Sequence, residues 1–505
     1  MTKKINQTDI NQAVWAACDT FRGTVDASIY KDYVLTMLFL KFLSDVWQEH
    51  YEHYEKEYGD APELIAEMLK NERFVLPSDA RFIRLYEQRH APGNGERIDK
   101  ALHAIEEANI TKLRDVFQDI SFNSTRLGEE KQKNELLAQL LEDFTDENLD
   151  LRLAHIGNQD VIGNAYEYLI SRFASEAGKT AGEFYTPAEI SELIAELVDP
   201  KEGDEICDPT CGSASLLMKC GRQIKRQYGG SKKYALFGQE SIGSTWALAK
   251  MNLFLHGEDN HRVEWGDTIR NPKLLDNEDR LMHFDVVVAN PPFSLAKWGH
   301  GTAEDDRFSR FRRGIPPRTK GDYAFILHMI ETMKPRTGRM GVVVPHGVLF
   351  RGSSEGKIRQ KLIEEQKLDA VIGLPEKLFF GTGIPAAILI FKQNKTDGSV
   401  LFIDASREYD SGKNQNRLDQ ARHIDKIVAT YRAREDVDKY AHLASPEEMA
   451  ENAFNLNIPR YVDTFEEEAE IDLMAVRAER QKLKAELADL EEKMDGYLKE
   501  LRYDV

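Results

Sequence analysis

The stretch from Asp285 to Phe293 contains the residues best suited to chemistry on an amino group. A short apolar run, predicted to be a buried strand, leads directly into Asn290-Pro291-Pro292-Phe293. The two prolines lack backbone N–H groups and stiffen the loop, so carbonyl groups can face a ligand. The Asn290 amide and a proline carbonyl can accept both hydrogens of an amino group, which leaves its lone pair available to attack a methylsulfonium. Phe293 offers a flat face for a base swung out of a duplex.

A tight turn at residues 206–217 joins a predicted strand to a predicted helix. Asp208 at the strand end can accept a hydrogen bond from a cationic or hydroxylated ligand, and Gly212 permits close approach of the backbone. We expect Ser213 and Ser215 to cap the helix that follows. The turn matches neither a dinucleotide-binding glycine motif nor a phosphate-binding P-loop. By itself it is equally compatible with a plain strand-to-helix connection.

Carboxylates follow the next two predicted strands. Glu240 ends the second strand, where an acidic residue can accept from both hydroxyls of a ribose. Asp267 follows the third strand and could accept from the exocyclic amine of a bound adenine. Because ligands in parallel sheets bind at the carboxyl ends of the strands, we expect these side chains to gather at one site.

Upstream of this turn, residues 182–189 combine an aromatic loop with a helix start. Thr186 as N-cap, Pro187 at the first helical position and Glu189 three residues after the cap predict a capping box. Capping does not account for Phe184 and Tyr185, which could form a wall of a cofactor pocket.

The elements that position these residues change along the chain. Residues 1 to about 170 show helical apolar spacing, and the most apolar stretch, Tyr33 to Leu43, predicts a buried helix too short to span a bilayer. Between about 180 and 410, short apolar strands alternate with helices, which predicts an α/β fold with a doubly wound, mainly parallel sheet. The expected strands are Glu205–Asp208, Ala235–Glu240, Arg262–Trp265, Phe284–Asn290, Met340–Pro345, Ala370–Leu374 and Ala386–Phe391.

Charge argues against an autonomous DNA-binding protein. The 505 residues carry a formal net charge of −19, whereas nonspecific DNA affinity comes mostly from neutralising phosphates. One basic block, Lys297 to Lys320, lies next to the Asn290 loop, and we interpret it as a mobile, phosphate-contacting loop. Its cations are Lys297, Arg307, Arg310, Arg312, Arg313, Arg318 and Lys320.

Cysteine usage and the N-terminus bear on the compartment. Four cysteines, Cys18, Cys207, Cys211 and Cys220, are too few for a disulfide scaffold. The spacing of the last three is not that of a paired zinc motif, so we expect buried free thiols and no metal. The first residues lack the apolar core of a signal peptide, and a cytoplasmic location is expected.

The C-terminal tail contains a heptad pattern. Its members fall on alternating steps of three and four residues, surrounded by Glu and Lys, which favours a coiled-coil seam. The pattern is equally compatible with a helix folded back on its own domain. The seam positions are Val476, Arg480, Leu483, Leu487, Leu490, Met494, Tyr497 and Leu501.

The ordered set 182–187, 208–215, 239–240, 267 and 290–293 resembles the amino-group DNA methyltransferases in which the cofactor motifs precede the catalytic one. More closely, the chain resembles the modification subunit of type I restriction-modification systems, a similarity supported by Tyr30–Leu35 and Asn455–Tyr461. It departs from many relatives at Ala214 and Ser215, where they repeat glycine.

This resemblance implies an N6-adenine DNA methyltransferase that uses S-adenosylmethionine. It implies a Rossmann-like methyltransferase sheet at 171–410, an N-terminal helical domain at 1–170 and a C-terminal helical region at 411–505 with its coiled-coil tail from about 470. Partners would be duplex DNA with the target adenine flipped out, a specificity subunit that reads the sequence, a second copy of this chain and a restriction subunit. Residues expected around the cofactor are Phe184, Tyr185, Thr186, Pro187, Asp208, Thr210, Gly212, Ser213, Glu240 and Asp267. Those expected at the target adenine are Asn290, Pro291, Pro292 and Phe293, and those at DNA phosphates are Lys297, Arg310, Arg312 and Arg313.

Two other functions fit parts of the pattern. Related enzymes with an Asn-Pro-Pro-aromatic loop methylate glutamine side chains of proteins, although the flanking helical regions and the seam count against that acceptor. A scaffold subunit that binds cofactor without chemistry is the second alternative, and the intact Asn290–Phe293 loop argues against it.

Overall fold

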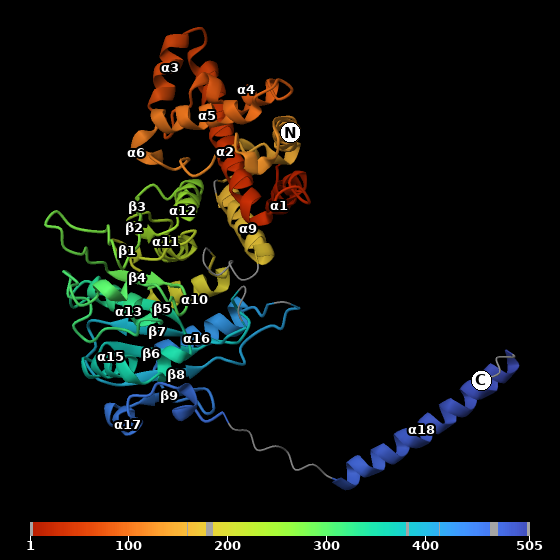
Figure 1. The fold of residues 1–505 in the computed structure, drawn as a ribbon, viewed down its shortest axis with the longest axis vertical. Helices are drawn as coiled ribbons and strands as arrows, with labels where there is room; N and C mark the ends of the chain where they lie inside the picture. The colour runs from red at the N-terminus through yellow and green to blue at the C-terminus, as the bar shows by residue number, and fades with distance from the viewer. Residues whose placement is uncertain are drawn as a thin grey trace. The chain divides into compact units, whose positions relative to one another are not determined.

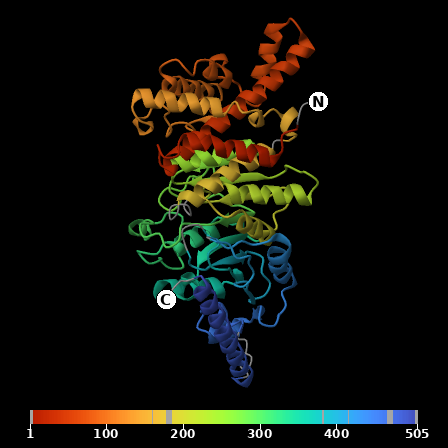
Figure 2. The same cartoon turned by 90° about the vertical axis from the view of Figure 1, so that its right-hand side faces the viewer.

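The computed structural model describes residues 4–158, 160–177, 185–379, 383–413, 415–464 and 473–501. It consists of two compact units, residues 1–462 and 463–505. Figures 1 and 2 show the first unit as a group of helices at the N-terminal end, followed by a wide twisted sheet that is flanked by further helices.

The N-terminal part is helical, as the apolar spacing predicts. Helix α2 begins after Asp26, whose carboxylate accepts from the backbone N–H of Ser28, and it ends at Gly59 with a φ of +57°. Its middle is buried from Tyr33 to Ser44, so the predicted buried helix is confirmed. Within the described residues, no helix is both long and apolar enough to span a bilayer. The helices are α1 (Gln7–Ala16), α2 (Ala27–Tyr58), α3 (Pro62–Lys70), α4 (Phe82–Glu87), α5 (Asn94–Ala108), α6 (Ile110–Leu113), α7 (Glu130–Asp143), α8 (Leu153–Ile156) and α9 (Asp160–Ala177).

The strands of the described residues form one sheet in the order β3-β2-β1-β4-β5-β7-β6-β8-β9. The first five in this order are parallel to one another, and β7 is antiparallel to both β5 and β6. The mainly parallel α/β sheet is therefore confirmed. The strands are β1 (Glu205–Asp208), β2 (Ala235–Glu240), β3 (His261–Trp265), β4 (Val286–Ala289), β5 (Arg339–Pro345), β6 (Leu368–Gly373), β7 (Ala386–Lys392), β8 (Val400–Asp404) and β9 (Ala441–Ala444).

The sequence did not predict β8 and β9. Strand β9 contains Ala-His-Leu-Ala, which has weak intrinsic strand preference, and it is fixed by antiparallel pairing with β8. Because this pairing is between segments far apart in the chain, local periodicity gives no sign of it. The sheet therefore continues past residue 410, where the sequence placed a domain boundary.

Both faces of the sheet are covered, which the continuous apolar strands require. Val286 and Val288 of β4 join one core cluster, whereas Val287 and Ala289 join the other. Apolar residues of α10, α11 and α12 belong to the first cluster, and those of α13 and α15 to the second. The helices of this region are α10 (Ala188–Val198), α11 (Ser215–Gln227), α12 (Gly243–Leu255), α13 (Asp322–Glu331), α14 (Gly347–Phe350), α15 (Ser353–Glu364), α16 (Asp425–Ala433) and α17 (Pro446–Glu451).

The second unit contains helix α18 (Leu473–Glu500), so the predicted helical tail is confirmed. The apolar members of its heptad seam are 51% to 68% exposed, from Val476 to Leu501. Gly496 lies within the helix, and no atom stands within 4 Å of where its side chain would begin. The seam is thus an apolar stripe, interrupted at Arg480, on an exposed helix.

Candidate active site

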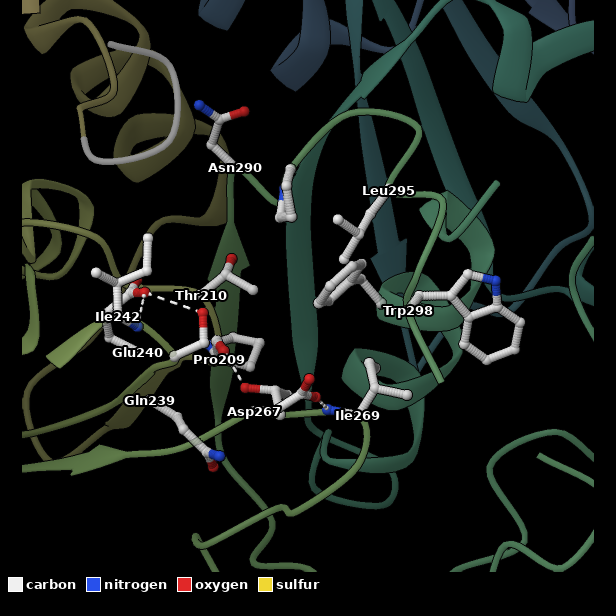
Figure 3. A pocket seen from close by; sticks show the side chains of 14 residues that line it. Pro209, Thr210, Gln239, Glu240, Ile242, Asp267, Ile269, Asn290, Leu295 and Trp298 are labelled. Carbon is white, nitrogen blue, oxygen red and sulfur yellow. Dashed lines mark hydrogen bonds between the residues drawn. The ribbon is translucent and has the colours of Figure 1, made fainter. Parts of the chain in front are cut away.

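The carboxyl ends of β1, β2, β3 and β4 meet at one edge of the sheet and line a pocket of about 250 Å³. Figure 3 shows Glu240 and Ile242 on one side of this pocket, Leu295 and Trp298 on the other, and Asn290 at the end away from Asp267. The residues expected from the sequence that line it are Thr210, Glu240, Asp267, Asn290 and Pro292.

The other residues expected at the site either do not line this pocket or fall outside the described residues. Gly182, Glu183 and Phe184 fall outside the described residues, so their role stays a prediction. Tyr185 is partly buried against the core, and burial raises the pKa of its hydroxyl to about 12. Of the cofactor and target-base residues expected from the sequence and described by the structure, eight do not line the pocket: Tyr185, Thr186, Pro187, Asp208, Gly212, Ser213, Pro291 and Phe293.

Asn290 is held by a residue from the segment before α10. Its Nδ2 donates to the Thr186 hydroxyl at 3.1 Å. Its Oδ1 is buried and accepts no hydrogen bond from any residue that the structure describes. A buried acceptor without a donor is costly, by about 1–3 kcal/mol, so this oxygen is suited to receive a hydrogen from a ligand.

The start of helix α10 shows that the predicted capping box is wrong. Helix α10 begins at Ala188, and its N-cap is Pro187, whose carbonyl accepts from the N–H groups of Ile190 and Ser191. Pro187 has an extended ψ of 136°, so the helix starts one residue later than expected. The Thr186 hydroxyl is thereby left to contact Asn290 instead of the helix end.

The loop after Asn290 is held by a hydrogen bond to the first residue of α13. The Asp322 carboxylate accepts from the backbone N–H of Ser294 at 2.7 Å, and its other oxygen pairs with Arg351 at 3.0 Å. Ser294 has a φ of +55°, so the carboxylate stabilises an unfavourable turn. The ring of Phe293 packs edge-on against Phe379 at 5.8 Å between centroids. Asp322 and Phe379 could not be placed at the site from the sequence, because both are distant from Asn290 in the chain.

The turn after β1 is bound to the end of β2. The Gly212 N–H donates to Glu240 Oε2 at 3.0 Å, and the Ile242 N–H donates to Glu240 Oε1 at 2.9 Å. Gly212 has a φ of +52°, a left-handed conformation that glycine adopts at little cost, and its role in close approach to a ligand stays a prediction. Asp208 is 2% exposed, and its Oδ1 accepts from the Thr210 N–H at 2.9 Å. Burial, with the nearby Glu240 carboxylate, raises the pKa of Asp208 to about 7, and burial likewise raises the pKa of Glu240.

The start of α11 differs from the expected serine cap. Its N-cap is Ala214, which has a left-handed φ of +65°, and no side chain caps the helix. The Ser213 and Ser215 hydroxyls are 3.1 Å apart and bond to each other. The prediction that they cap the helix is therefore wrong, because the two hydroxyls bond to each other and neither binds a backbone N–H of the first turn.

Two of the four cysteines, Cys207 and Cys211, lie in this turn region, and all four are buried as free thiols, as expected. Burial raises the pKa of both thiols well above the ordinary range. They are therefore packing residues.

Asp267 closes the far end of the pocket. Its Oδ1 accepts from the backbone N–H groups of Ile269 and Arg270 at 2.9 and 2.8 Å, which leaves Oδ2 with more acceptor capacity. The adjacent Thr268 hydroxyl donates to the Pro209 carbonyl and so joins the β3 end to the β1 turn. The pocket floor is thus a connected set of backbone and carboxylate contacts.

The basic block does not present all of its arginines to solvent. Arg310 is 3% exposed; its guanidinium pairs with Asp306 at 2.7 Å and donates to the carbonyls of Thr268 and Ile269 at 3.1 and 2.7 Å. Arg313 is 2% exposed and pairs with Glu331 and with Glu365. The prediction that Arg310 and Arg313 contact phosphates is therefore wrong, because their charges are used to fix the loop to the core.

The other predicted phosphate ligands are accessible. Lys297 is exposed, and Arg312 is half-exposed and pairs with Glu331. Their contact with DNA stays a prediction.

The chain matches the sequence models of two protein families. The N-6 DNA Methylase family covers residues 157–470, and the HsdM N-terminal domain covers residues 10–144. The chain is 32% identical to the methylase subunit of the type I restriction enzyme MjaVIII from Methanocaldococcus jannaschii, over 99% of this chain and 86% of that relative. It is 29% identical to the methylase subunit of MpnII from Mycoplasma pneumoniae, over 98% of this chain and 96% of that relative.

A solved structure agrees with these relatives. The methyltransferase subunit of a type I restriction-modification system from Streptococcus thermophilus is 38% identical, with a TM-score of 0.80 over 91% of this chain and 100% of that one. The chain therefore belongs to the N-6 DNA methylases, the adenine-specific DNA methyltransferases, and within them to the methylase subunits of type I restriction enzymes.

Proposed function

We propose that this chain transfers a methyl group from S-adenosylmethionine to the N6 amino group of adenine in DNA, as the modification subunit of a type I restriction-modification complex. The observation that carries the proposal is the buried Oδ1 of Asn290, which has no donor within the described residues and lies on a residue that lines the pocket. An amino group supplies the donor that this oxygen lacks.

The donor set of the pocket fits this cofactor. Glu240 accepts from two backbone N–H groups and the Ser241 hydroxyl, and a carboxylate has about four acceptor sites, so capacity remains for a ribose hydroxyl. Asp267 Oδ2 can accept from an exocyclic amine, and the half-exposed Ile242 offers an apolar face beside it. When bound, S-adenosylmethionine supplies a methyl group already activated by its sulfonium.

The loop residues then act on the target base. Asn290 Oδ1 and a carbonyl of the proline pair accept the two hydrogens of the N6 amino group, which keeps the nitrogen lone pair directed at the electrophile. Phe293, backed by Phe379, provides a ring face for the flipped base. Thr186 fixes the amide of Asn290 so that its oxygen, and not its nitrogen, is the free group.

Sequence recognition is assigned to a separate specificity subunit, joined by two copies of this chain and, in the full complex, by a restriction subunit. The net charge of −19 and the internal pairing of Arg310 and Arg313 both leave this chain with a weak grip on DNA. The exposed seam of α18 provides an apolar stripe that can pack on helices of the specificity subunit.

Tritiated methyl transfer to unmethylated DNA, with the co-expressed specificity subunit present, tests the proposal. Wild-type chain should label DNA, and Asn290→Ala should lower the rate by about 10²–10³-fold while cofactor binding persists. Asn277→Ala, which changes an exposed asparagine away from the pocket, is the matched control and should match wild type. Label in protein only would favour the glutamine-methylating alternative, and an unchanged rate for Asn290→Ala would contradict the catalytic assignment.

A further inference from the structure

A groove lies between the basic block and helix α15. It has a volume of about 390 Å³ and is walled by Gly314 and Ile315 on one side and by side chains of α15 on the other. The wall is close, because a side chain at Gly314 would begin 3.0 Å from Ile358 Cγ1, and the φ of +141° at this position favours glycine. Arg313 holds that wall in place through its pairs with Glu331 and Glu365.

Two lysines of α15 line this groove. Lys357 and Lys361 are four residues apart and therefore lie on the same helix face, about 6 Å apart along the axis. Both are exposed, and neither is held in an ion pair with any residue in the described part of the chain. Arg310, Arg312 and Arg313 of the block, in contrast, are paired with Asp306, Glu331 and Glu365. Among the residues that line this groove, the positive charges without an ion-pair partner are therefore those of Lys357 and Lys361.

The groove is linked to the catalytic loop by a short chain of contacts. Ser294 follows Phe293, bonds to Asp322, and Asp322 pairs with Arg351. Arg351 stands two residues before α15 begins at Ser353, and Lys357 lies about 6 Å further along the helix. A base flipped onto Phe293 keeps its flanking phosphates outside the pocket. The N-terminal end of α15 is the end that this chain of contacts joins to the Phe293 loop.

We propose that the groove between 313–315 and α15 binds the phosphodiester backbone of the DNA strand beside the target adenine, with Lys357 and Lys361 as its phosphate ligands. The inference rests on the proposed function, since it assumes a DNA substrate. Charge complementarity selects this occupant: phosphates recur about every 3.4 Å of axial rise on one strand, so two ammonium groups one helical turn apart can engage the same strand. Glu364, the single carboxylate among the lining residues, lies at the last residue of α15, away from the catalytic loop.

The test compares DNA binding by the complex of this chain with its specificity subunit at several salt concentrations. The double variant Lys357→Gln/Lys361→Gln should lower the slope of log affinity against log salt by about 1.8, or about 0.9 per lost phosphate contact. Between 200 and 50 mM salt, the gain in affinity should then be about tenfold smaller than for wild type. The rate at saturating DNA and the affinity for S-adenosylmethionine should not change.

Two further variants complete the design. Lys357→Arg/Lys361→Arg keeps both charges and should restore the wild-type slope. Lys201→Gln/Lys233→Gln removes equal charge at residues that precede β1 and β2, at the opposite edge of the sheet, and should leave the slope unchanged. An unchanged slope for the glutamine double variant would overturn the inference, and so would loss of a protein partner with the slope preserved. A wild-type complex that neither binds nor methylates DNA would instead overturn the proposed function.

Discussion

Asn290 and Thr186 are joined by a 3.1 Å hydrogen bond between segments 104 residues apart. The amide nitrogen is used in this contact, so the amide oxygen is the group left for a ligand. A threonine whose sequence context suggested a helix cap thus contacts Asn290, and we propose that it positions this asparagine for catalysis.

Replacing Thr186 with valine should remove this contact and preserve the shape of the side chain. We expect the single-turnover rate of methyl transfer to fall about fivefold, because a neutral hydrogen bond contributes about 1 kcal/mol and about 1.4 kcal/mol is a factor of ten. Thr186→Ser keeps the hydroxyl and should retain most of the rate. If Thr186→Val weakens cofactor binding and leaves the rate unchanged, Thr186 acts on the cofactor and does not position Asn290.

The cofactor affinity of the chain should depend on pH through Asp208. Burial and the nearby Glu240 raise the pKa of Asp208 to about 7, above its ordinary value of 3.8, so the folded chain holds this proton more tightly than the unfolded chain. The resulting contribution to stability is complete below pH 4 and is lost as the pH rises through about 7. A cationic ligand favours the carboxylate, so its affinity should rise with pH by at most tenfold per unit and level off above 7.

Calorimetric titration of S-adenosylmethionine between pH 5.5 and 8.5 measures this dependence. Asp208→Asn cannot titrate and should give a flatter profile, with weaker binding at pH 8. A profile as steep as that of wild type would show that another group, such as Glu240, is responsible.

Replacement of Arg310 with alanine should destabilise the fold far more than replacement of Arg312, although the two arginines are only two residues apart. Arg310→Ala removes the cation that pairs with the Asp306 carboxylate and the guanidinium donors to two backbone carbonyls, which should lower the free energy of unfolding by about 3–5 kcal/mol. Arg312→Ala removes a half-exposed ion pair and should cost less than about 1 kcal/mol. Denaturant unfolding followed by circular dichroism provides the comparison. Equal effects would contradict the assignment of Arg310 as a structural residue.

The seam of α18 should be needed for assembly and not for cofactor binding. Leu483→Glu/Leu490→Glu places two charges in the stripe and should abolish co-purification with the specificity subunit, as should removal of residues 470–505. Ala478→Glu/Ala485→Glu adds the same charge on the opposite face of the helix and is the matched control. Retained co-purification of the leucine variant would refute the docking role.

The positions of β1 to β7 and the candidate residues at the ends of β1 to β4 could be predicted from the sequence, whereas β8 and β9 could not. Strands β1 and β2 were predicted to the residue, because apolar runs bounded by turn residues are a local signal. The convergence of Glu240, Asp267 and Asn290 on one pocket also followed from sequence, since the carboxyl ends of parallel strands share an edge.

Which polar side chains remain available to a ligand depends on contacts that form only in the folded chain. Arg310 and Arg313 look like surface cations in the sequence. Nothing in the sequence indicates that Arg310 binds the carbonyls of Thr268 and Ile269 or that Arg313 pairs with Glu365. The partners of Asn290, Ser294 and Phe293 are likewise Thr186, Asp322 and Phe379, all distant in the chain. Burial and pairing are relations between distant segments, and sequence periodicity describes only neighbours along the chain.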